Sequence, residues 1–157
     1  MMEERKKYYF ESKFGLFSIV CDDKFLYRLD KIEKRTFKST SEENELCRKV
    51  KLELNEYFLK VRRDFDIPIN LEGTSFQIKV WHALIKIPYG QTFSYQDIAI
   101  NIGKPKACRA VGGANNKNPI IIIVPCHRVI GKNGSLTGYG GGLDLKEKLL
   151  NLEKNII

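Results

Sequence analysis

Residues 120–130 read Ile-Ile-Ile-Ile-Val-Pro-Cys-His-Arg-Val-Ile, and this stretch decides how the rest of the chain is interpreted. Its first five residues are all β-branched, which favours a strand buried on both faces. Pro125 cannot donate to a sheet ladder, so the strand should end there and turn. The sequence therefore predicts that Cys126 and His127 are presented from the end of a rigid, buried strand.

Cys126 and His127 pair a soft nucleophile with a side chain that exchanges protons near neutral pH. Taken singly, each residue is more often structural, since a lone cysteine commonly packs as a small hydrophobe. Neighbouring residues on an extended segment also point to opposite faces, so a water or a third group would have to connect the two side chains. The dipeptide alone leaves a catalytic and a structural role open.

The charge of the chain is unevenly distributed. The chain has 157 residues, which is enough for one ordinary domain or two small ones. Its formal net charge is +8. Residues 1–70 hold 16 basic and 14 acidic side chains, whereas residues 71–157 hold 11 basic and 5 acidic ones. The basic second half indicates a polyanionic partner, nucleic acid before membrane, although a merely soluble basic surface would look the same.

The four cysteines lie at positions 21, 47, 108 and 126, without a C-x-x-C motif and with only two histidines in the chain. This spacing predicts neither a zinc site nor a disulfide framework. The charged N-terminus lacks the apolar core of a signal peptide, and no apolar run is long enough to span a bilayer. We therefore expect a cytoplasmic protein with reduced thiols, no metal and no membrane association.

The first half of the chain has the pattern of a small scaffold. Apolar stretches at 8–10, 14–21 and 25–29 predict an antiparallel meander. A helix should follow, with Thr40 and Glu43 as a capping box. Its apolar residues at helical spacing are Leu46, Val50, Leu54, Tyr57, Phe58 and Val61. Residues 64–73 contain Pro68 and Gly73 and are predicted to link the two halves.

The second half predicts two short helices in succession. Ser94 with Asp97 fits a capping box for the first, as Thr74 with Gln77 does for the helix before it. Gly103 ends the first helix, and a second should run from about residue 106 to 115. This arrangement resembles a helix-turn-helix. The second helix is almost without bulk, which suits either close approach to a ligand or tight packing on a neighbouring helix.

Two features near the C-terminus complete the pattern. Residues 138–142 form a glycine-rich loop that could wall a pocket. A final helix follows, with Asp144 and Glu147 as its capping pair. Glu153 lies late in this helix, where an anion is unfavourable on dipole grounds. Its carboxylate has either an interior partner or a solvated position at the helix end.

Read together, several motifs resemble the O6-alkylguanine-DNA alkyltransferase family. They are Pro125 to Ile130, Ser94-Tyr95-Gln96, Arg109 to Ala114, Asn118-Pro119, and the glycine-rich loop leading into Lys146-Glu147. The resemblance covers residues 75–153, about half of the chain. It implies an α/β (α+β) protein of two domains. Residues 1–70 would form a small ribonuclease-H-like sheet-plus-helix domain, and residues 71–157 a mostly helical domain with the helix-turn-helix and the Pro-Cys-His-Arg motif.

The resemblance implies a specific chemistry for Cys126. This residue would take the alkyl group from O6 of guanine, with O4 of thymine as a second candidate, and form a thioether that nothing in the chain hydrolyses. His127 would act as the base through a water, Glu153 would orient it, and Asn118 would be the hinge between the small helix and the active-site strand. Cys21 lacks the neighbouring histidine of zinc-bearing relatives, so neither metal nor cofactor is expected.

The resemblance also implies a monomer acting on double-stranded DNA that contains O6-alkylguanine. The damaged base must be flipped out to reach a buried thiol, while the small helix enters the minor groove. Arg109 would fill the gap in the stack, and Tyr95 would press on the target phosphate and contact the base. The remaining positions assigned to substrate or DNA binding are Gln77, Gln96, Lys104, Lys132, Tyr139, Gly140 and Lys146.

Three other functions fit parts of the sequence. A non-catalytic protein that binds alkylated DNA and recruits other repair factors would have a bulky residue in place of Cys126. A helix-turn-helix regulator would carry bulky polar side chains on its recognition helix to read the major groove. A thiol hydrolase would need an oxyanion hole and would regenerate its thiol. Direct reversal of alkylation damage accounts for more of the motifs than any of these.

Overall fold

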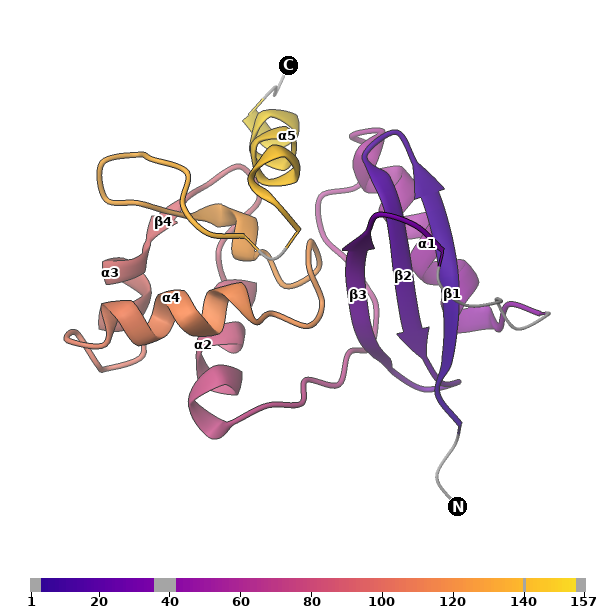
Figure 1. Cartoon of the computed structure of the whole chain (residues 1–157), viewed down its shortest axis with the longest axis horizontal. Coiled ribbons are helices and arrows are strands. Elements are labelled where there is room, and N and C mark those ends of the chain that lie inside the picture. Colours follow the sequence, from indigo (N-terminus) through magenta and orange to yellow (C-terminus); the bar gives the residue numbers. More distant parts are fainter. Residues whose placement is uncertain (1–3, 36–41, 140, 155–157) are drawn as a thin grey trace. The chain divides into compact units, whose positions relative to one another are not determined.

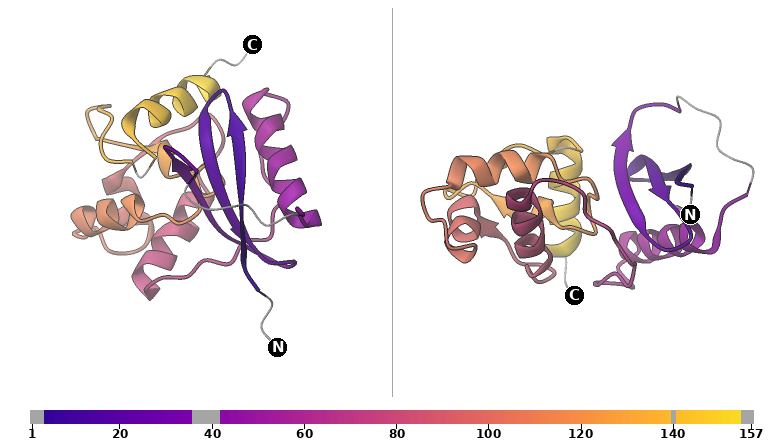
Figure 2. Two further views of the ribbon diagram at one scale, coloured as in Figure 1. Left: turned by 45° about the vertical axis from the view of Figure 1, so that its right-hand side comes forward. Right: turned by 90° about the horizontal axis from the view of Figure 1, so that it is seen from below.

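The computed structural model describes residues 4–35, 42–139 and 141–154, and the chain divides into two compact units, Met1–Leu71 and Glu72–Ile157. The first unit is a three-stranded sheet with a helix, and the second is a mainly helical body (Figures 1 and 2). The fold class expected from the sequence, α+β with a small sheet domain before a helical one, is confirmed. None of the described helices is both long and apolar enough to cross a membrane.

The sheet of the first unit is the predicted antiparallel meander. Its strands are β1 (Lys6–Ser12), β2 (Gly15–Cys21) and β3 (Leu26–Ile32), paired in the order β1-β2-β3. Ile19 of β2 pairs with Tyr8 on one side and with Leu29 on the other. All three side chains are buried, and they form the middle of the domain core.

Helix α1 (Glu45–Phe58) covers one face of this sheet (Figures 1 and 2). It begins later than predicted, because the Asn44 side chain accepts a hydrogen bond from the backbone N–H of Cys47 at 2.8 Å and provides the N-cap. Thr40, the predicted cap, lies outside the described residues. The helix ends before Val61, whose side chain is 73% exposed and not part of the core. Lys60 adopts a left-handed φ of 65° just after the helix, which stops further propagation.

The second unit is built on three helices, α2 (Ser75–Ile85), α3 (Tyr95–Asn101) and α4 (Cys108–Asn116). Both predicted capping boxes are present, Thr74 with Gln77 and Ser94 with Asp97. Gly103 follows α3 with φ +77°, so α3, the turn and α4 form the expected helix-turn-helix. Helix α2 packs against both of its helices.

A pair of two-residue strands joins the helix-turn-helix to the Cys-His motif. Strand β4 (Phe93–Ser94) pairs in parallel with β5 (Val129–Ile130). Helix α3 starts directly after β4, and β5 directly follows the 3₁₀ turn η1 (Cys126–Arg128). The final helix α5 (Leu143–Lys154) contacts η1 and starts one residue earlier than the predicted capping residue Asp144. This pairing places the start of α3 beside the turn that carries Cys126.

The predicted buried strand over residues 120–124 is wrong. The segment is a compact turn in which the N–H of Val124 donates to the carbonyl of Ile120 at 3.0 Å, and Ile122 has a left-handed φ of 73°. The Asn118 side chain accepts from the Ile120 N–H at 2.9 Å and donates to the Val124 carbonyl at 2.7 Å, so it supplies bonds that a sheet partner would have made. The β-branched run predicted burial, and all of its residues are buried except the half-buried Ile123. Burial, however, does not require an extended backbone.

Candidate active site

Cys126 lies in the 3₁₀ turn η1, and its side chain is completely buried. The Asn118 amide donates a hydrogen bond to its Sγ at 3.1 Å. Burial raises the pKa of the thiol to about 11, although the Asn118 hydrogen bond and the positive charge of Lys146 act in the opposite direction. At neutral pH the resting side chain is therefore a thiol, and it needs a proton acceptor before it can attack as a thiolate.

His127 is paired with Glu153 in the interior of the second unit. Its Nε2 lies 2.7 Å from Oε2 of Glu153, and both side chains are buried. Burial lowers the pKa of His127 more than the carboxylate raises it, so the ring is neutral at pH 7. Burial opposes ionisation of Glu153, but its bonds to His127 and Arg128 outweigh this and hold its pKa well below the usual range.

The ionised Glu153 determines which nitrogen of His127 carries the proton. A carboxylate can only accept a hydrogen bond, so Nε2 must be the donor and Nδ1 must hold the free lone pair. Nδ1 is buried and has no hydrogen-bond partner in the described part of the chain. The sequence left the position of Glu153 open between interior and solvent, and the structure places it in the interior. The arrangement leaves a neutral base on the residue next to Cys126.

Arg128 also belongs to this cluster, although the sequence motifs predicted no role for it. Its Nε and Nη2 donate to the two carboxylate oxygens of Glu153 at 2.9 and 3.0 Å, and its Nη1 donates to the carbonyl of Ile87 at 2.6 Å. The guanidinium also lies over the ring of Tyr89, 5.7 Å from its centre. A cation inside a buried apolar run needs a carboxylate partner, so the position of Arg128 in the sequence could have predicted this ion pair.

Lys146, predicted from the sequence to bind substrate or DNA, is wholly buried. Its ammonium donates to the carbonyl oxygens of Thr137 at 2.7 Å and Gly138 at 3.5 Å. Burial lowers its pKa to about 8, and the neighbouring Cys126 acts in the opposite direction. The ammonium therefore anchors the glycine-rich loop from the inside and is not a surface cation.

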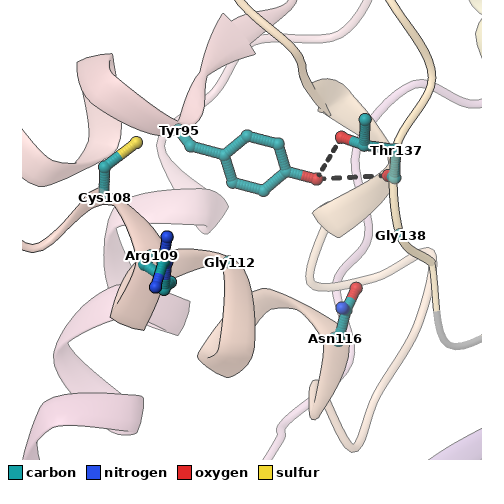
Figure 3. A pocket seen from close by; sticks show the side chains of 7 residues that line it. All are labelled: Tyr95, Cys108, Arg109, Gly112, Asn116, Thr137 and Gly138. Atoms are coloured by element: carbon teal, nitrogen blue, oxygen red, sulfur yellow. Dashed lines mark hydrogen bonds between the residues drawn. The ribbon is translucent and has the colours of Figure 1, made fainter.

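Tyr95 and Arg109 come together at a cavity of about 470 Å³ in the second unit (Figure 3). Tyr95 comes from the start of α3, and Arg109 from the exposed side of α4. Residues 137 and 138, at the start of the glycine-rich loop, also line the cavity. The lining residues are Tyr95, Cys108, Arg109, Gly112, Asn116, Thr137 and Gly138. The structure thus brings together, on one cavity, residues that belong to three separate sequence motifs.

The glycines of α4 are not explained by packing between helices. A Cβ atom added at Gly113 would meet nothing within 4 Å, and one added at Gly112 would make only an ordinary contact of 3.8 Å with the Tyr95 ring. On its other side, α4 is held by the Trp81 indole, which donates to the Ala114 carbonyl at 2.9 Å. Of the two explanations left open by the sequence, the structure favours an open face that allows close approach.

The other predicted contact residues have varied environments. The Gln77 side chain accepts from the Thr74 N–H at 3.0 Å in the capping box of α2, and the Gln96 amide donates to the Pro105 carbonyl at 2.9 Å. Lys104 is exposed, with its ammonium 5.5 Å from the centre of the Phe76 ring, and Lys132 is exposed in a loop. Gly140 lies outside the described residues. Within the described ranges no three His, Cys, Asp or Glu side chains are placed to hold a metal ion.

Comparison with known proteins covers both units of the chain. Residues 75–155 match the profile described as the DNA binding domain of 6-O-methylguanine DNA methyltransferase, and residues 5–71 match its ribonuclease-like domain. The chain belongs to the 6-O-methylguanine DNA methyltransferase family. The resemblance drawn from the motifs is thereby confirmed, and the family's DNA binding domain contains both the helix-turn-helix and the Cys126 cluster.

Individual members of the family are similar over most of their length. The methylated-DNA–protein-cysteine methyltransferase of Methanosarcina barkeri is 48% identical over 149 residues, covering 92% of this chain and 94% of the relative. That of Methanosarcina acetivorans is 59% identical over 112 residues, 71% of this chain and 72% of the relative. The crystal structure of Mycobacterium tuberculosis OGT in complex with DNA superimposes with a TM-score of 0.86 at 46% identity, covering 93% of this chain and 91% of that one.

Proposed function

We propose that this protein repairs DNA by direct damage reversal, moving the alkyl group from O6 of guanine in duplex DNA to Sγ of its own Cys126. The observation that carries this proposal is a fully buried thiol beside a neutral histidine whose Nε2 is committed to Glu153. The names of relatives that are 48% and 59% identical, methylated-DNA–protein-cysteine methyltransferase, support the same activity.

The transfer proceeds by nucleophilic displacement. Nδ1 of His127 takes the thiol proton through a water, and the imidazolium that results is stabilised by the Glu153 carboxylate. The Sγ–C bond then forms as the O6–C bond breaks. The electron pair of the broken bond stays with the guanine, which takes up one proton and becomes an ordinary base. Asn118, at 3.1 Å from Sγ, holds the sulfur in place.

The reaction consumes the protein. Cys126 ends as a thioether, and cleaving a thioether needs a far better nucleophile than a water activated by histidine. Each molecule therefore accepts one alkyl group and does not turn over.

O4-alkylthymine is a second candidate substrate. The thiol must stay reduced to react, which supports a cytoplasmic location.

DNA binding is assigned to residues 71–157, with residues 1–70 as a structural domain. The open face of α4 at Gly113 enters the minor groove, and Arg109 fills the gap that the flipped base leaves in the stack. Tyr95, at the cavity, contacts the flipped base and its phosphate. The exposed cations Lys104 and Lys132 contact the DNA backbone. The M. tuberculosis relative crystallised with DNA supports DNA as the partner, and a monomer suffices because a single chain carries every residue used.

The decisive experiment is the intact mass of the protein after incubation with duplex DNA that contains O6-methylguanine, followed by peptide mapping. We expect one added methyl group on Cys126, saturating at one per molecule, and none in the variant Cys126→Ala. DNA binding without any change of mass would instead support the alternative, a non-catalytic protein that binds alkylated DNA and recruits other repair factors.

A further inference from the structure

Thr137 makes three hydrogen bonds that join Tyr95 of the helix-turn-helix to the buried Lys146. Its Oγ1 donates to the Tyr95 hydroxyl at 3.0 Å, and the Tyr95 hydroxyl donates to the Thr137 carbonyl oxygen at 3.1 Å (Figure 3). The same carbonyl accepts from the Lys146 ammonium at 2.7 Å. Tyr95 and Thr137 are 42 positions apart in sequence, and neither motif predicts the other.

We propose that Thr137 is a positioning residue for alkyl transfer, which fixes the Tyr95 phenol at the cavity where the flipped base enters. This assignment rests on the proposed function. A tyrosine hydroxyl has one proton to donate and lone pairs to accept, and here a single residue both receives its proton and donates to it. The two bonds together hold the phenol oxygen in place, because the loss of either leaves it restrained from one direction only.

Thr137 itself is held from two sides, so it can act as a fixed support. On the inner side, the buried Lys146 ammonium has its shortest hydrogen bond to the Thr137 carbonyl, and a buried cation is costly to leave without acceptors. On the outer side, Gly138 lies against α4, where an added Cβ would come within 2.7 Å of the Asn116 side chain. Moving the loop would therefore disturb the Lys146 anchor or collide with α4.

The chemical consequence concerns the geometry of attack. The Tyr95 ring also lies 3.8 Å from the position of a Cβ on Gly112, so the phenol defines the space between α3, α4 and the loop. A base placed against a fixed phenol keeps its O6 substituent in one position relative to Sγ. Small misplacement of reacting groups costs rate more than affinity, since most binding energy comes from the DNA backbone. The hydroxyl of Thr137 should therefore affect the transfer step more than DNA binding.

The test compares Thr137→Val with Thr137→Ser in the full-length chain. Valine keeps the shape of threonine and removes the donor, whereas serine keeps the hydroxyl. Single-turnover transfer from O6-methylguanine duplex DNA is measured over a range of DNA concentrations. We expect Thr137→Val to lower the maximal rate by about tenfold while the half-saturating DNA concentration changes less than about twofold. Thr137→Ser should restore the rate to within about twofold of the original protein.

A double variant separates positioning from a general structural effect. Tyr95→Phe removes the hydroxyl that Thr137 holds, so adding Thr137→Val to it should cause no further loss of rate. Additive losses, an unaffected Thr137→Val protein, or failure of serine to restore the rate would each overturn this assignment. If the unaltered protein transfers no methyl group at all, the proposed function fails, which is a distinct result.

Discussion

Arg128 and Glu153, 25 positions apart in sequence, form a buried bidentate ion pair, with N–O distances of 2.9 and 3.0 Å. The same carboxylate also receives the backbone N–H of Gly90 at 3.1 Å and bonds Nε2 of His127 at 2.7 Å. Donors from three residues thus converge on one buried carboxylate. Glu153 therefore neutralises a buried arginine, and in the proposed reaction it has a second role, to orient the His127 base.

Replacing Glu153 by glutamine should affect both roles. Glutamine keeps the size of the side chain but leaves the Arg128 charge buried without a counter-charge, which should lower the free energy of unfolding by about 3 kcal/mol. Transfer should also slow, because nothing stabilises the imidazolium of His127. Urea denaturation and single-turnover transfer measure the two effects. Lys148→Gln, which breaks an exposed ion pair on the same helix, is the control and should change stability by less than about 1 kcal/mol. Equal effects in the two variants would contradict the buried-pair assignment.

The pH dependence of transfer should follow His127. Burial lowers the pKa of His127 below its ordinary value of 6.5, so the ring is still mostly a neutral base at pH 6.5. The single-turnover rate should therefore stay near its neutral-pH value down through pH 6.5 and fall only in more acid solution. The unfolded chain protonates this histidine first, so its contribution to the free energy of unfolding also decreases as the pH falls below 6.5. If the rate has already fallen to half of its neutral-pH value at pH 6.5 or above, His127 is not the base.

Gly113→Ala should separate folding from DNA binding. The added methyl group meets nothing within 4 Å, and alanine is the better helix former, so the free energy of unfolding should rise by about 0.5 to 1 kcal/mol. Binding to duplex DNA should weaken, because the methyl group stands on the face proposed to enter the minor groove. Gly103→Ala is the control for the sign of the stability change, since its φ of +77° disfavours alanine and should make that variant less stable. Unchanged DNA affinity in Gly113→Ala would place the groove contact elsewhere.

Asn118→Ala should loosen the turn that presents Cys126. The variant removes bonds to the Ile120 N–H, the Val124 carbonyl and Sγ of Cys126, so the free energy of unfolding should fall by about 2 to 3 kcal/mol. In the original protein the Asn118 amide lowers the pKa of the thiol, so alkylation of Cys126 by iodoacetamide should require a higher pH in the variant. Asn116→Ala, at an exposed position on α4, serves as the stability control. If the pH dependence of Cys126 alkylation is the same in the variant, Asn118 acts only on the backbone of the turn.

Arg109 and Lys104 should differ in how they affect DNA binding. Arg109→Ala should reduce extrusion of the damaged base, read from the fluorescence of a 2-aminopurine placed beside it, with a smaller change in salt dependence. Lys104→Ala should instead weaken binding to all sequences and reduce the slope of log K against log salt by about 1. If Arg109→Ala changes only the salt dependence of binding, Arg109 does not fill the gap in the base stack.

Several features that depend on neighbours in sequence were predicted correctly, although the cap of α1 is Asn44 and not the predicted Thr40. The capping boxes at Thr74 and Ser94 and the turn at Gly103 are set by hydrogen bonds and backbone angles within a few residues. The motifs around Cys126, Tyr95 and Arg109, read together with the others, indicated the family, and the family profiles confirm it. A short-range pattern can be read directly because both partners of each interaction lie in the same window of sequence.

Only the tertiary structure decided the features whose partners are distant in sequence. The run of isoleucines at 120–123 is an exception, because its turn is closed by the side chain of Asn118, which is only two and six residues from its partners Ile120 and Val124. The interior position of Glu153 depends on Arg128 and His127, and the bonds of Thr137 depend on Tyr95. Sequence determined the local elements and the reactive pair, because propensity and capping are local. The fold determined which buried charges and hydroxyls meet, because each pairing is settled by packing across the whole domain.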